Sequence, residues 1–209
     1  MSLSERLRRA RLYLVIDVEA AERVVPAALE GGVDLVQLRE KSASDAEVVA
    51  IGRSLRSLCE EHGALFIVND RPDLALACGA DGVHVGQDDM PVGEARALVG
   101  DDRIVGVSTH SPEQVDAALA SDADYFAVGP VYATPTKPGR PAVGLELVRY
   151  VASLGTAKPW FAIGGIDPGN VTGVADAGAT RIVVVRAIRD AEDPRAAAEA
   201  LRLEEAHVR

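Results

Sequence analysis

Two aspartates in this sequence have the spacing expected of ligands for a hard metal ion. Asp70 and Asp89 each follow a short apolar run that we interpret as a β-strand, and the two runs are consecutive along the chain. Carboxylate oxygens from neighbouring loops, completed by phosphate oxygens and water, form the coordination that Mg²⁺ prefers. We therefore predict that Asp70 and Asp89 bind Mg²⁺. By spacing alone Asp88 could replace Asp89, and a turn-forming role is the structural alternative for each aspartate.

Three basic residues, Arg39, Lys41 and Lys137, also follow predicted strands. The chain has only three lysines and a formal net charge of -10, so a local group of cations needs a specific explanation. A solvated surface position would account for any one of them. An acidic protein that gathers three cations around one metal site is suited to bind a polyanion such as diphosphate.

A glycine pair, Gly164-Gly165, follows another strand and precedes Asp167-Pro168, which we interpret as the beginning of a helix. Glycine lets backbone N–H groups approach an anion closely, and the N-terminus of a helix favours negative charge. We predict a phosphate site at this pair, with an ordinary turn as the alternative.

Two of the four histidines lie in or next to predicted strands. His84 is within a strand, where it is either a structural histidine or a ligand-binding one. His110 comes just after a strand and is predicted to face the site. No arrangement of a nucleophilic Ser or Cys with a base accompanies them, so covalent catalysis is not indicated.

The elements that must position these residues are eight short runs rich in Val, Ile and Leu, alternating with longer segments of helical periodicity. Near-continuous hydrophobicity is typical of parallel strands that are covered on both faces. Ser44 with Glu47, and Ser111 with Gln114, have the spacing of helix capping boxes. The predicted strands are residues 12–16, 33–38, 65–68, 82–85, 104–107, 125–128, 160–163 and 182–185.

Eight strand–helix units in 209 residues predict an α/β protein with a single (β/α)8 TIM barrel. An open doubly wound sheet is the competing architecture. In a TIM barrel the loops after the carboxyl ends of the strands carry the chemistry, and this is where the polar residues above occur. The proline-rich segment 129–143 is predicted to be a lid at this end.

Composition predicts one domain over residues 1–209, with residues 1–10 as an N-terminal extension and 203–209 as a C-terminal tail. The acidic net charge argues against nucleic-acid and anionic-membrane partners, and no apolar run approaches the roughly 20 residues of a membrane span. Cys59 and Cys78 lack the spacing of a metal site and are predicted to be buried thiols of a cytoplasmic protein. A homo-oligomer is compatible with this pattern.

Five sequence motifs, in unbroken order, resemble the thiamine-phosphate synthase family, and the resemblance extends from about residue 12 to residue 202. The motifs are Gln-Leu-Arg-Glu-Lys at 37–41, Val-Asn-Asp at 68–70, Gly-Val-His-Val-Gly-Gln-Asp-Asp at 82–89, Gly-Pro-Val-Tyr-Ala-Thr-Pro-Thr-Lys at 129–137 and Ile-Gly-Gly-Ile at 163–166.

This resemblance implies an enzyme that condenses 4-amino-2-methyl-5-hydroxymethylpyrimidine diphosphate with 4-methyl-5-(2-hydroxyethyl)thiazole phosphate, giving thiamine phosphate and diphosphate. It implies Mg²⁺ as the cofactor. The implied catalytic residues are Arg39, Lys41, Ser108 and Lys137. The implied ligands of the pyrimidine diphosphate are Gln37, Leu38, Arg39, Glu40, Lys41, Asn69, Ser108 and Lys137. The implied ligands of the thiazole phosphate are Thr134, Pro135, Thr136, Gly165, Val185 and Arg186. His84, His110 and Gly164 are further predicted substrate-binding residues.

The implied mechanism is dissociation of diphosphate, assisted by Mg²⁺ and the cations, followed by attack of the thiazole nitrogen on a pyrimidine carbocation. Arg186 departs from the family, in which many members have Ser, so a thiazole phosphate contact at this position must come from the backbone or from the Arg side chain. The alternatives are a thiazole tautomerase with His110 as its catalytic residue, a non-catalytic phosphate-binding barrel and, more distantly, a sugar-phosphate isomerase or aldolase.

Overall fold

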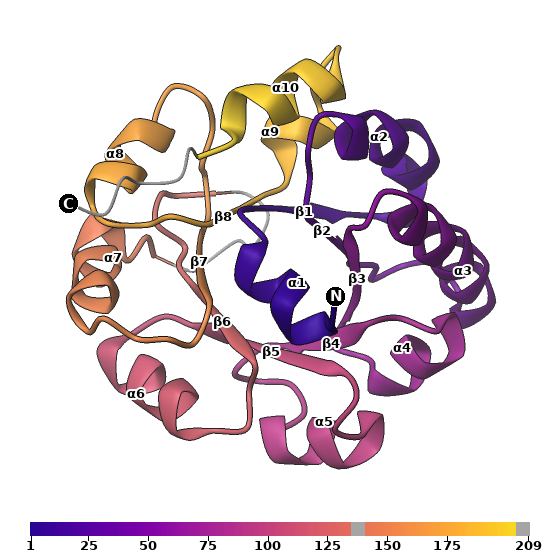
Figure 1. Ribbon diagram of the computed structural model, residues 1–209, viewed down its shortest axis with the longest axis horizontal. Coiled ribbons are helices and arrows are strands. Elements are labelled where there is room, and N and C mark those ends of the chain that lie inside the picture. Colours follow the sequence, from indigo (N-terminus) through magenta and orange to yellow (C-terminus); the bar gives the residue numbers. More distant parts are fainter. Residues whose placement is uncertain (135–140, 204–209) are drawn as a thin grey trace.

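Eight parallel strands form a closed barrel in the computed structural model, which describes residues 1–134 and 141–203 (Figure 1). The strands follow one another around the barrel in chain order, and the last pairs with the first, with Leu12 opposite Ile182. The predicted (β/α)8 barrel is therefore confirmed, and the doubly wound alternative is wrong. The strands are β1 (Leu12–Ile16), β2 (Leu35–Leu38), β3 (Leu65–Asn69), β4 (Gly82–Val85), β5 (Ile104–Thr109), β6 (Tyr125–Val128), β7 (Trp160–Ile163) and β8 (Ile182–Val184).

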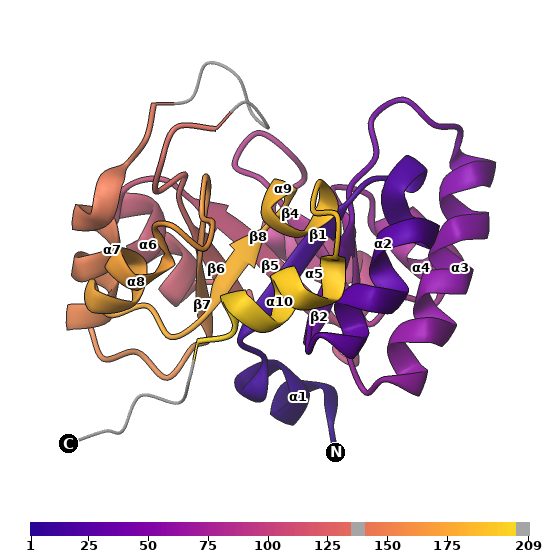
Figure 2. The same cartoon turned by 90° about the horizontal axis from the view of Figure 1, so that it is seen from above.

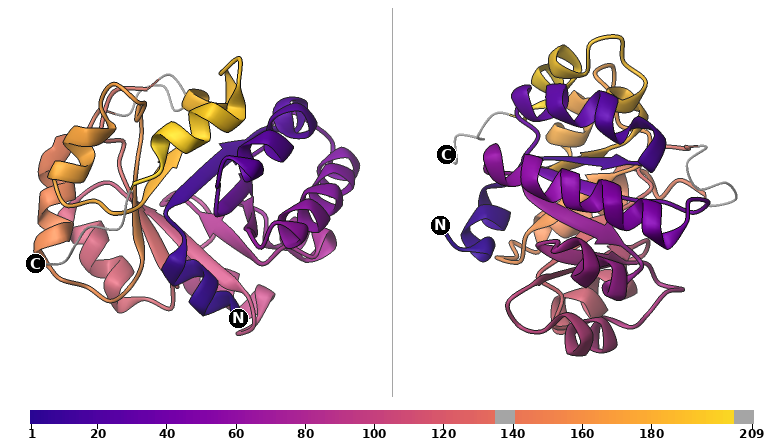
Figure 3. Two further views of the ribbon diagram at one scale, coloured as in Figure 1. Left: turned by 45° about the horizontal axis from the view of Figure 1, so that its top comes forward. Right: turned by 90° about the vertical axis from the view of Figure 1, so that its right-hand side faces the viewer.

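Helices surround the barrel and cover its outer surface (Figures 1 and 3). Each strand is followed along the chain by at least one helix, as the right-handed crossover between parallel strands requires. The helices are α1 (Leu3–Arg9), α2 (Val18–Glu30), α3 (Asp45–Glu61), α4 (Pro72–Cys78), α5 (Val92–Val99), α6 (Pro112–Ala120), α7 (Gly144–Ser153), α8 (Val171–Asp176), α9 (Arg186–Arg189) and α10 (Pro194–Leu201).

The core has two layers because successive side chains of a strand point to opposite faces of the sheet. In β1, Tyr13 and Val15 belong to a cluster inside the barrel. Leu12, Leu14 and Ile16 pack in the larger cluster between the strands and the helices. Odd and even positions of one apolar run are thus committed to different layers.

Helix α1 lies across the amino-terminal end of the barrel (Figures 1 and 2). Its Leu7 and the following Ala10 are buried and join the interior cluster. Ser2 begins the helix with a capping box to Glu5. Most of the segment predicted to be an extension, residues 1–10, is therefore a helix that covers the interior at the end opposite the site.

The helix starts confirm part of the capping pattern. Ser44 and Glu47 form the predicted reciprocal box at the beginning of α3. Ser111 accepts from the N–H of Gln114 as predicted, but Gln114 Oε1 accepts the N–H of His110, 2.7 Å away, instead of closing a box on Ser111. The side chain of Gln114 thereby fixes the backbone of a residue at the site.

Cys59 and Cys78 are buried and free, as predicted. Burial raises the pKa of the Cys59 thiol to about 12, so this thiol is not a nucleophile at neutral pH. In the described part of the chain, no helix has both the length and the apolar content that crossing a membrane requires.

Candidate active site at the carboxyl end of the barrel

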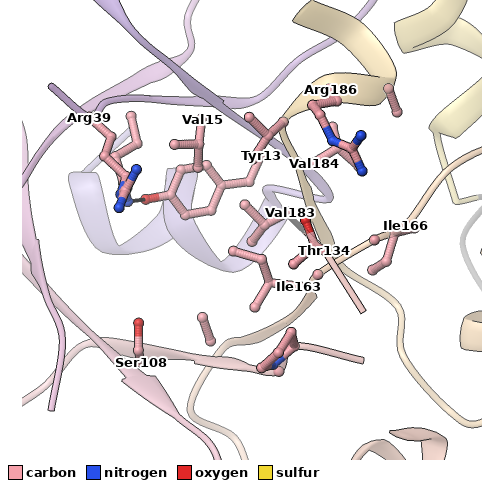
Figure 4. Close-up of a pocket in the computed structure, with 18 of the residues that line it drawn as sticks. Tyr13, Val15, Arg39, Ser108, Thr134, Ile163, Ile166, Val183, Val184 and Arg186 are labelled. Atoms are coloured by element: carbon pink, nitrogen blue, oxygen red, sulfur yellow. Dashed lines mark hydrogen bonds between the residues drawn. The ribbon is translucent and has the colours of Figure 1, made fainter. Parts of the chain in front are cut away.

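A cavity of about 310 Å³ occupies the carboxyl end of the barrel (Figure 4). Residues two apart along the inward face of the strands line it, as the strand period requires. Most of the predicted substrate-binding residues lie together in its wall. Those that line the cavity are Gln37, Arg39, Asn69, His84, Ser108, His110, Thr134, Gly164, Gly165, Val185 and Arg186.

Arg39, which comes directly after β2, brings a positive charge to one side of this cavity (Figure 4). Its Nε is buried and has no hydrogen-bond partner among the residues that the structure describes. An unpaired buried donor costs about 1–3 kcal/mol. A ligand oxygen at this position would remove that cost, so the side chain is suited to bind an anion.

Glu40 organises the loop that begins after Arg39. Its Oε1 accepts the backbone N–H groups of Lys41, Ser42 and Ala43 at 2.6, 2.8 and 3.3 Å, and its Oε2 accepts the N–H of Val18 at 3.2 Å. These bonds, the one from the N–H of Ser42 first, lower the pKa of Glu40 to about 2. The Glu40 carboxylate thus stabilises the conformation of the loop.

Leu38 and Lys41 lie outside the cavity wall. The Leu38 side chain is buried among the apolar residues that face the helices. The exposed Lys41 lines a neighbouring surface pocket, of which Arg39 is also a part. A contact from Leu38 to a ligand would have to use its backbone, and Lys41 would approach a ligand from the rim.

The Gly164-Gly165 turn forms another part of the wall. Both glycines have positive φ angles, 107° and 65°, and a Cβ would overlap Pro130 at Gly164 and crowd Tyr132 at Gly165. Both positions therefore require glycine. The turn exposes backbone at the cavity, which is what a phosphate site needs.

The prediction that a helix begins at Asp167-Pro168, directly after this turn, is wrong. Asp167 Oδ1 accepts the N–H of Gly169 at 2.8 Å, forming a local turn, and α8 begins only at Val171. Asn170 precedes α8, and its Nδ2 donates to the carbonyl of Gly165 at 2.8 Å. The turn is consequently held by a side-chain amide and not by a capped helix.

The two predicted metal ligands lie in loops that follow adjacent strands. Asp70 directly follows β3 and has a left-handed backbone, with φ 59°. Asp89 follows β4, and its Oδ2 accepts the N–H of Gly86 at 2.9 Å. The described residues contain no cluster of three or more His, Cys, Asp or Glu side chains that could hold a metal, so an ion on these aspartates would take further ligands from substrate and water.

His84 and His110 both line the cavity and hydrogen-bond differently. His84 is buried, with Nδ1 2.9 Å from the Tyr125 hydroxyl and Nε2 2.9 Å from Ser108 Oγ. His110 donates from Nδ1 to the carbonyl of Gly129, which fixes its ring at the cavity edge. His84 is a hydrogen-bonded interior residue that also lies in the cavity wall, and its ligand-binding role stays a prediction.

Three predicted site residues, Pro135, Thr136 and Lys137, lie outside the described residues. So does the central part of the predicted lid, residues 135–140. The interior tyrosines Tyr13 and Tyr125 were missed. A sequence signal for them exists: they are tyrosines inside apolar strands of a chain with only 4% aromatic residues, and a buried hydroxyl needs a partner.

A closed (β/α)8 barrel with a cavity at its carboxyl end, lined by Arg39, Arg186 and the Gly164-Gly165 turn, defines a TIM-barrel protein. Solved structures agree with the fold: the 3-hexulose-6-phosphate synthase of Salmonella typhimurium covers 91% of this chain with a TM-score of 0.67 at 17% identity. A sequence model of the family described as thiamine monophosphate synthase matches residues 12–188, and the chain belongs to this family.

Individual relatives are similar over nearly their whole length. The thiamine-phosphate synthase of Acidothermus cellulolyticus is 54% identical over 197 residues, covering 92% of this chain and 93% of the relative. That of Mycolicibacterium vanbaalenii is 51% identical and covers 96% of both chains. The solved thiamine phosphate pyrophosphorylase of Pyrococcus furiosus superposes with a TM-score of 0.82 at 37% identity, covering 94% of this chain and 95% of that one.

Proposed function

We propose that this protein is a thiamine-phosphate synthase, which joins the pyrimidine diphosphate to the thiazole phosphate and releases diphosphate. The observation that carries the proposal is that one cavity has an arginine on each of two sides, with other side chains between them. Arg39 lies on one side of it and Arg186 on the other, with Val15 and Tyr13 between them (Figure 4). Two phosphorylated substrates that must react with each other need this arrangement.

The reaction breaks the bond between the pyrimidine methylene carbon and a diphosphate oxygen, and the bonding electron pair leaves with diphosphate. Arg39, Lys41 and Lys137 stabilise the charge that develops on the leaving group. The methylene cation that remains is delocalised over the aminopyrimidine ring. The thiazole nitrogen then donates its lone pair to this carbon, which gives thiamine phosphate without any proton transfer.

The thiazole phosphate binds at the opposite side of the cavity. We assign it to Thr134, Pro135, Thr136, the backbone of the Gly164-Gly165 turn, and Val185 with Arg186. Holding the phosphate here fixes the thiazole nitrogen at one distance from the pyrimidine methylene, which replaces a bimolecular encounter by an oriented one. Arg186 adds a side-chain charge to backbone contacts at this site.

Asp70 and Asp89 fit a divalent cation by the chemistry of their donors, since carboxylate oxygens from neighbouring loops suit Mg²⁺. The N–H of Gly86 donates to Oδ2 of Asp89, which orients the carboxylate that would hold the ion. When bound, Mg²⁺ would supply positive charge that stabilises the departing diphosphate. The left-handed backbone of Asp70 supports a functional role, because unusual backbone conformations concentrate at functional sites.

A diphosphate-release assay with both heterocyclic substrates tests the proposal. We expect release that requires the two substrates together and stops when Mg²⁺ is chelated, with stoichiometric formation of thiamine phosphate. Binding of the substrates without release would favour the non-catalytic barrel instead. Isomerisation of a thiazole without any need for the pyrimidine diphosphate would favour the tautomerase.

A further inference from the structure

A continuous chain of hydrogen bonds crosses the interior of the barrel beneath the cavity. Gln37 donates from Nε2 to the Tyr13 hydroxyl, which is 2.9 Å from the Tyr125 hydroxyl. Tyr125 is in turn 2.9 Å from His84 Nδ1, and His84 Nε2 is 2.9 Å from Ser108 Oγ. All five residues are buried, and all of them except Tyr125 line the cavity, including Gln37 and Ser108 at the two ends.

Aromatic packing holds the two tyrosines of this hydrogen-bond chain in place. Tyr13 and Tyr125 contact each other edge-to-face, with ring centroids 6.1 Å apart, and both pack edge-to-face on Phe161. Gly106 lies beside Tyr125 in the register of β5 with β6, and a Cβ at Gly106 would overlap the phenol ring. Figure 4 shows the Tyr13 side chain extending toward the side of the pocket on which Arg39 lies.

Both hydroxyls remain protonated at any working pH, because burial raises the pKa of Tyr13 and of Tyr125 far above the ordinary value of 10. Each hydroxyl therefore has one proton to donate, and every buried proton is paired only when all the hydrogen bonds run in the same direction.

Donation by Gln37 sets that direction. Tyr13 accepts from Gln37, so its own proton is paired only when it donates to Tyr125, and Tyr125 then donates to Nδ1 of His84. Because Nδ1 of His84 accepts from Tyr125, the ring proton is on Nε2 and is donated to Ser108 Oγ. The hydroxyl proton of Ser108 is left to point to the cavity, and Gln37 is left to offer its Oε1.

From this geometry we propose that Tyr13 and Tyr125 are specificity-determining positioning residues, which fix Gln37 as an acceptor and Ser108 as a donor toward the heterocycle. This inference rests on the proposed function. An aminopyrimidine matches that pattern, since its exocyclic amine donates and its ring nitrogens accept. A 4-oxopyrimidine does not match it, because its carbonyl accepts and the adjacent ring N–H donates. If the hydrogen bonds ran in the opposite direction, the roles of Gln37 and Ser108 toward the heterocycle would be exchanged together.

The first test compares substrates. We would measure kcat/KM for the aminopyrimidine diphosphate and for its 4-oxo analogue in wild type, Tyr13→Phe and Tyr125→Phe. Each substitution removes one hydroxyl and keeps the packed ring. The preference for the amino substrate should fall by at least about tenfold in both variants. It should fall through KM for the pyrimidine, with KM for the thiazole phosphate unchanged.

Tyr150→Phe is the matched control, because the Tyr150 hydroxyl donates to Asp116 on the outer surface, 2.9 Å away, and has no part in the chain. It should leave the preference as in wild type. An unchanged preference in folded Tyr13→Phe and Tyr125→Phe would overturn the proposal.

The second test needs no turnover. ¹⁵N spectra of histidine-labelled protein, assigned with His84→Gln, report which ring nitrogen carries the proton. Wild type should show His84 protonated on Nε2, and Tyr125→Phe should lose this fixed tautomer. Protonation of wild-type His84 on Nδ1 would overturn the proposal even if the enzyme were active. The protein could instead show the expected His84 tautomer and fail to join the two heterocycles. That result would support the direction of the hydrogen-bond chain and reject the proposed function.

Discussion

The backbone N–H of Asp70 donates a hydrogen bond to the carbonyl oxygen of His84, 2.8 Å away. Asp70 has the left-handed backbone, the only non-glycine residue with positive φ in the described part of the chain, and His84 belongs to the interior hydrogen-bond chain. One peptide contact therefore couples a candidate metal ligand to the polar floor of the cavity. Asp is among the residues that tolerate this conformation, because its short side chain can hydrogen-bond locally.

Replacing Asp70 tests charge and backbone separately. Asp70→Asn should leave the melting temperature unchanged, since Asn also adopts the left-handed region. It should raise the Mg²⁺ concentration for half-maximal activity by at least about tenfold. Asp70→Ala should lose this affinity and also about 1 kcal/mol of stability. A Mg²⁺ titration and thermal unfolding of both variants measure the two effects, and wild-type Mg²⁺ dependence in Asp70→Asn would remove the residue from the metal site.

Replacing Asp89 tests the second ligand. Asp89→Asn should abolish Mg²⁺-dependent turnover, while the amide oxygen can still accept the N–H of Gly86 and preserve the turn. Binding of the thiazole phosphate, followed by calorimetry, should remain largely intact because that substrate is assigned to the other side of the cavity. Turnover equal to that of wild type would show that the metal assignment is wrong.

Replacing Arg39 should raise the stability of the protein and lower its activity. Arg39→Met removes a buried Nε that has no partner among the described residues, so the unliganded protein should gain about 1 kcal/mol in urea unfolding. The same change should lower kcat/KM for the pyrimidine diphosphate by about a hundredfold. Arg53→Met is the control, because Arg53 Nε donates to the carbonyl of Ala77 at the surface. A loss of stability in Arg39→Met would indicate a structural arginine.

Replacing Lys137 tests a cation that lies outside the described residues. Lys137→Ala should slow diphosphate release by about a hundredfold with little change in melting temperature, because its expected partner is the leaving group and not the protein. Single-turnover kinetics and thermal unfolding make the comparison. Parallel losses of rate and stability would point to a structural lysine instead.

Replacing Glu40 should change how stability depends on pH. Its pKa is lowered from about 4.5 to about 2, so its contribution to stability is complete above pH 4.5 and is lost as the pH falls toward 2. Glu40→Gln should therefore cost about 1 kcal/mol at pH 7, and the difference from wild type should disappear near pH 2. Urea unfolding across this range measures it. A difference that persisted undiminished at pH 2 would show that the loop does not depend on the ionised carboxylate.

The strands could be predicted from the sequence because burial on both faces requires a continuous run of apolar residues. The bounds of β1, β4, β6 and β7 agree with the predicted runs to the residue. The prediction ended β3 before Asn69 and β5 before Ser108 and Thr109. These polar residues continue the strands because barrel register pairs them with β4 and β6, which hydrophobicity cannot reveal.

Turns were less accessible because several local hydrogen bonds compete for the same donors. Asp167-Pro168 has the form of a helix start, yet Asp167 bonds to Gly169 and the helix begins three residues later. Glu40 has the same ambiguity: its motif suggests a ligand contact, but its carboxylate accepts four backbone N–H groups, three from its own loop and one from Val18 at the beginning of α2.

The sequence by itself determined the number and order of the strands, the polar residues at their carboxyl ends and the family, since each of these depends on residue types at short spacing. Only the tertiary structure decided which residues share the cavity and which face the helices. The reason is that closure of the barrel determines which side chains of each strand point inward. The tertiary structure also decided that Tyr13 and Tyr125, 112 residues apart, form one hydrogen bond. Contacts between distant segments depend on the register of all the strands between them, and no local pattern encodes that register.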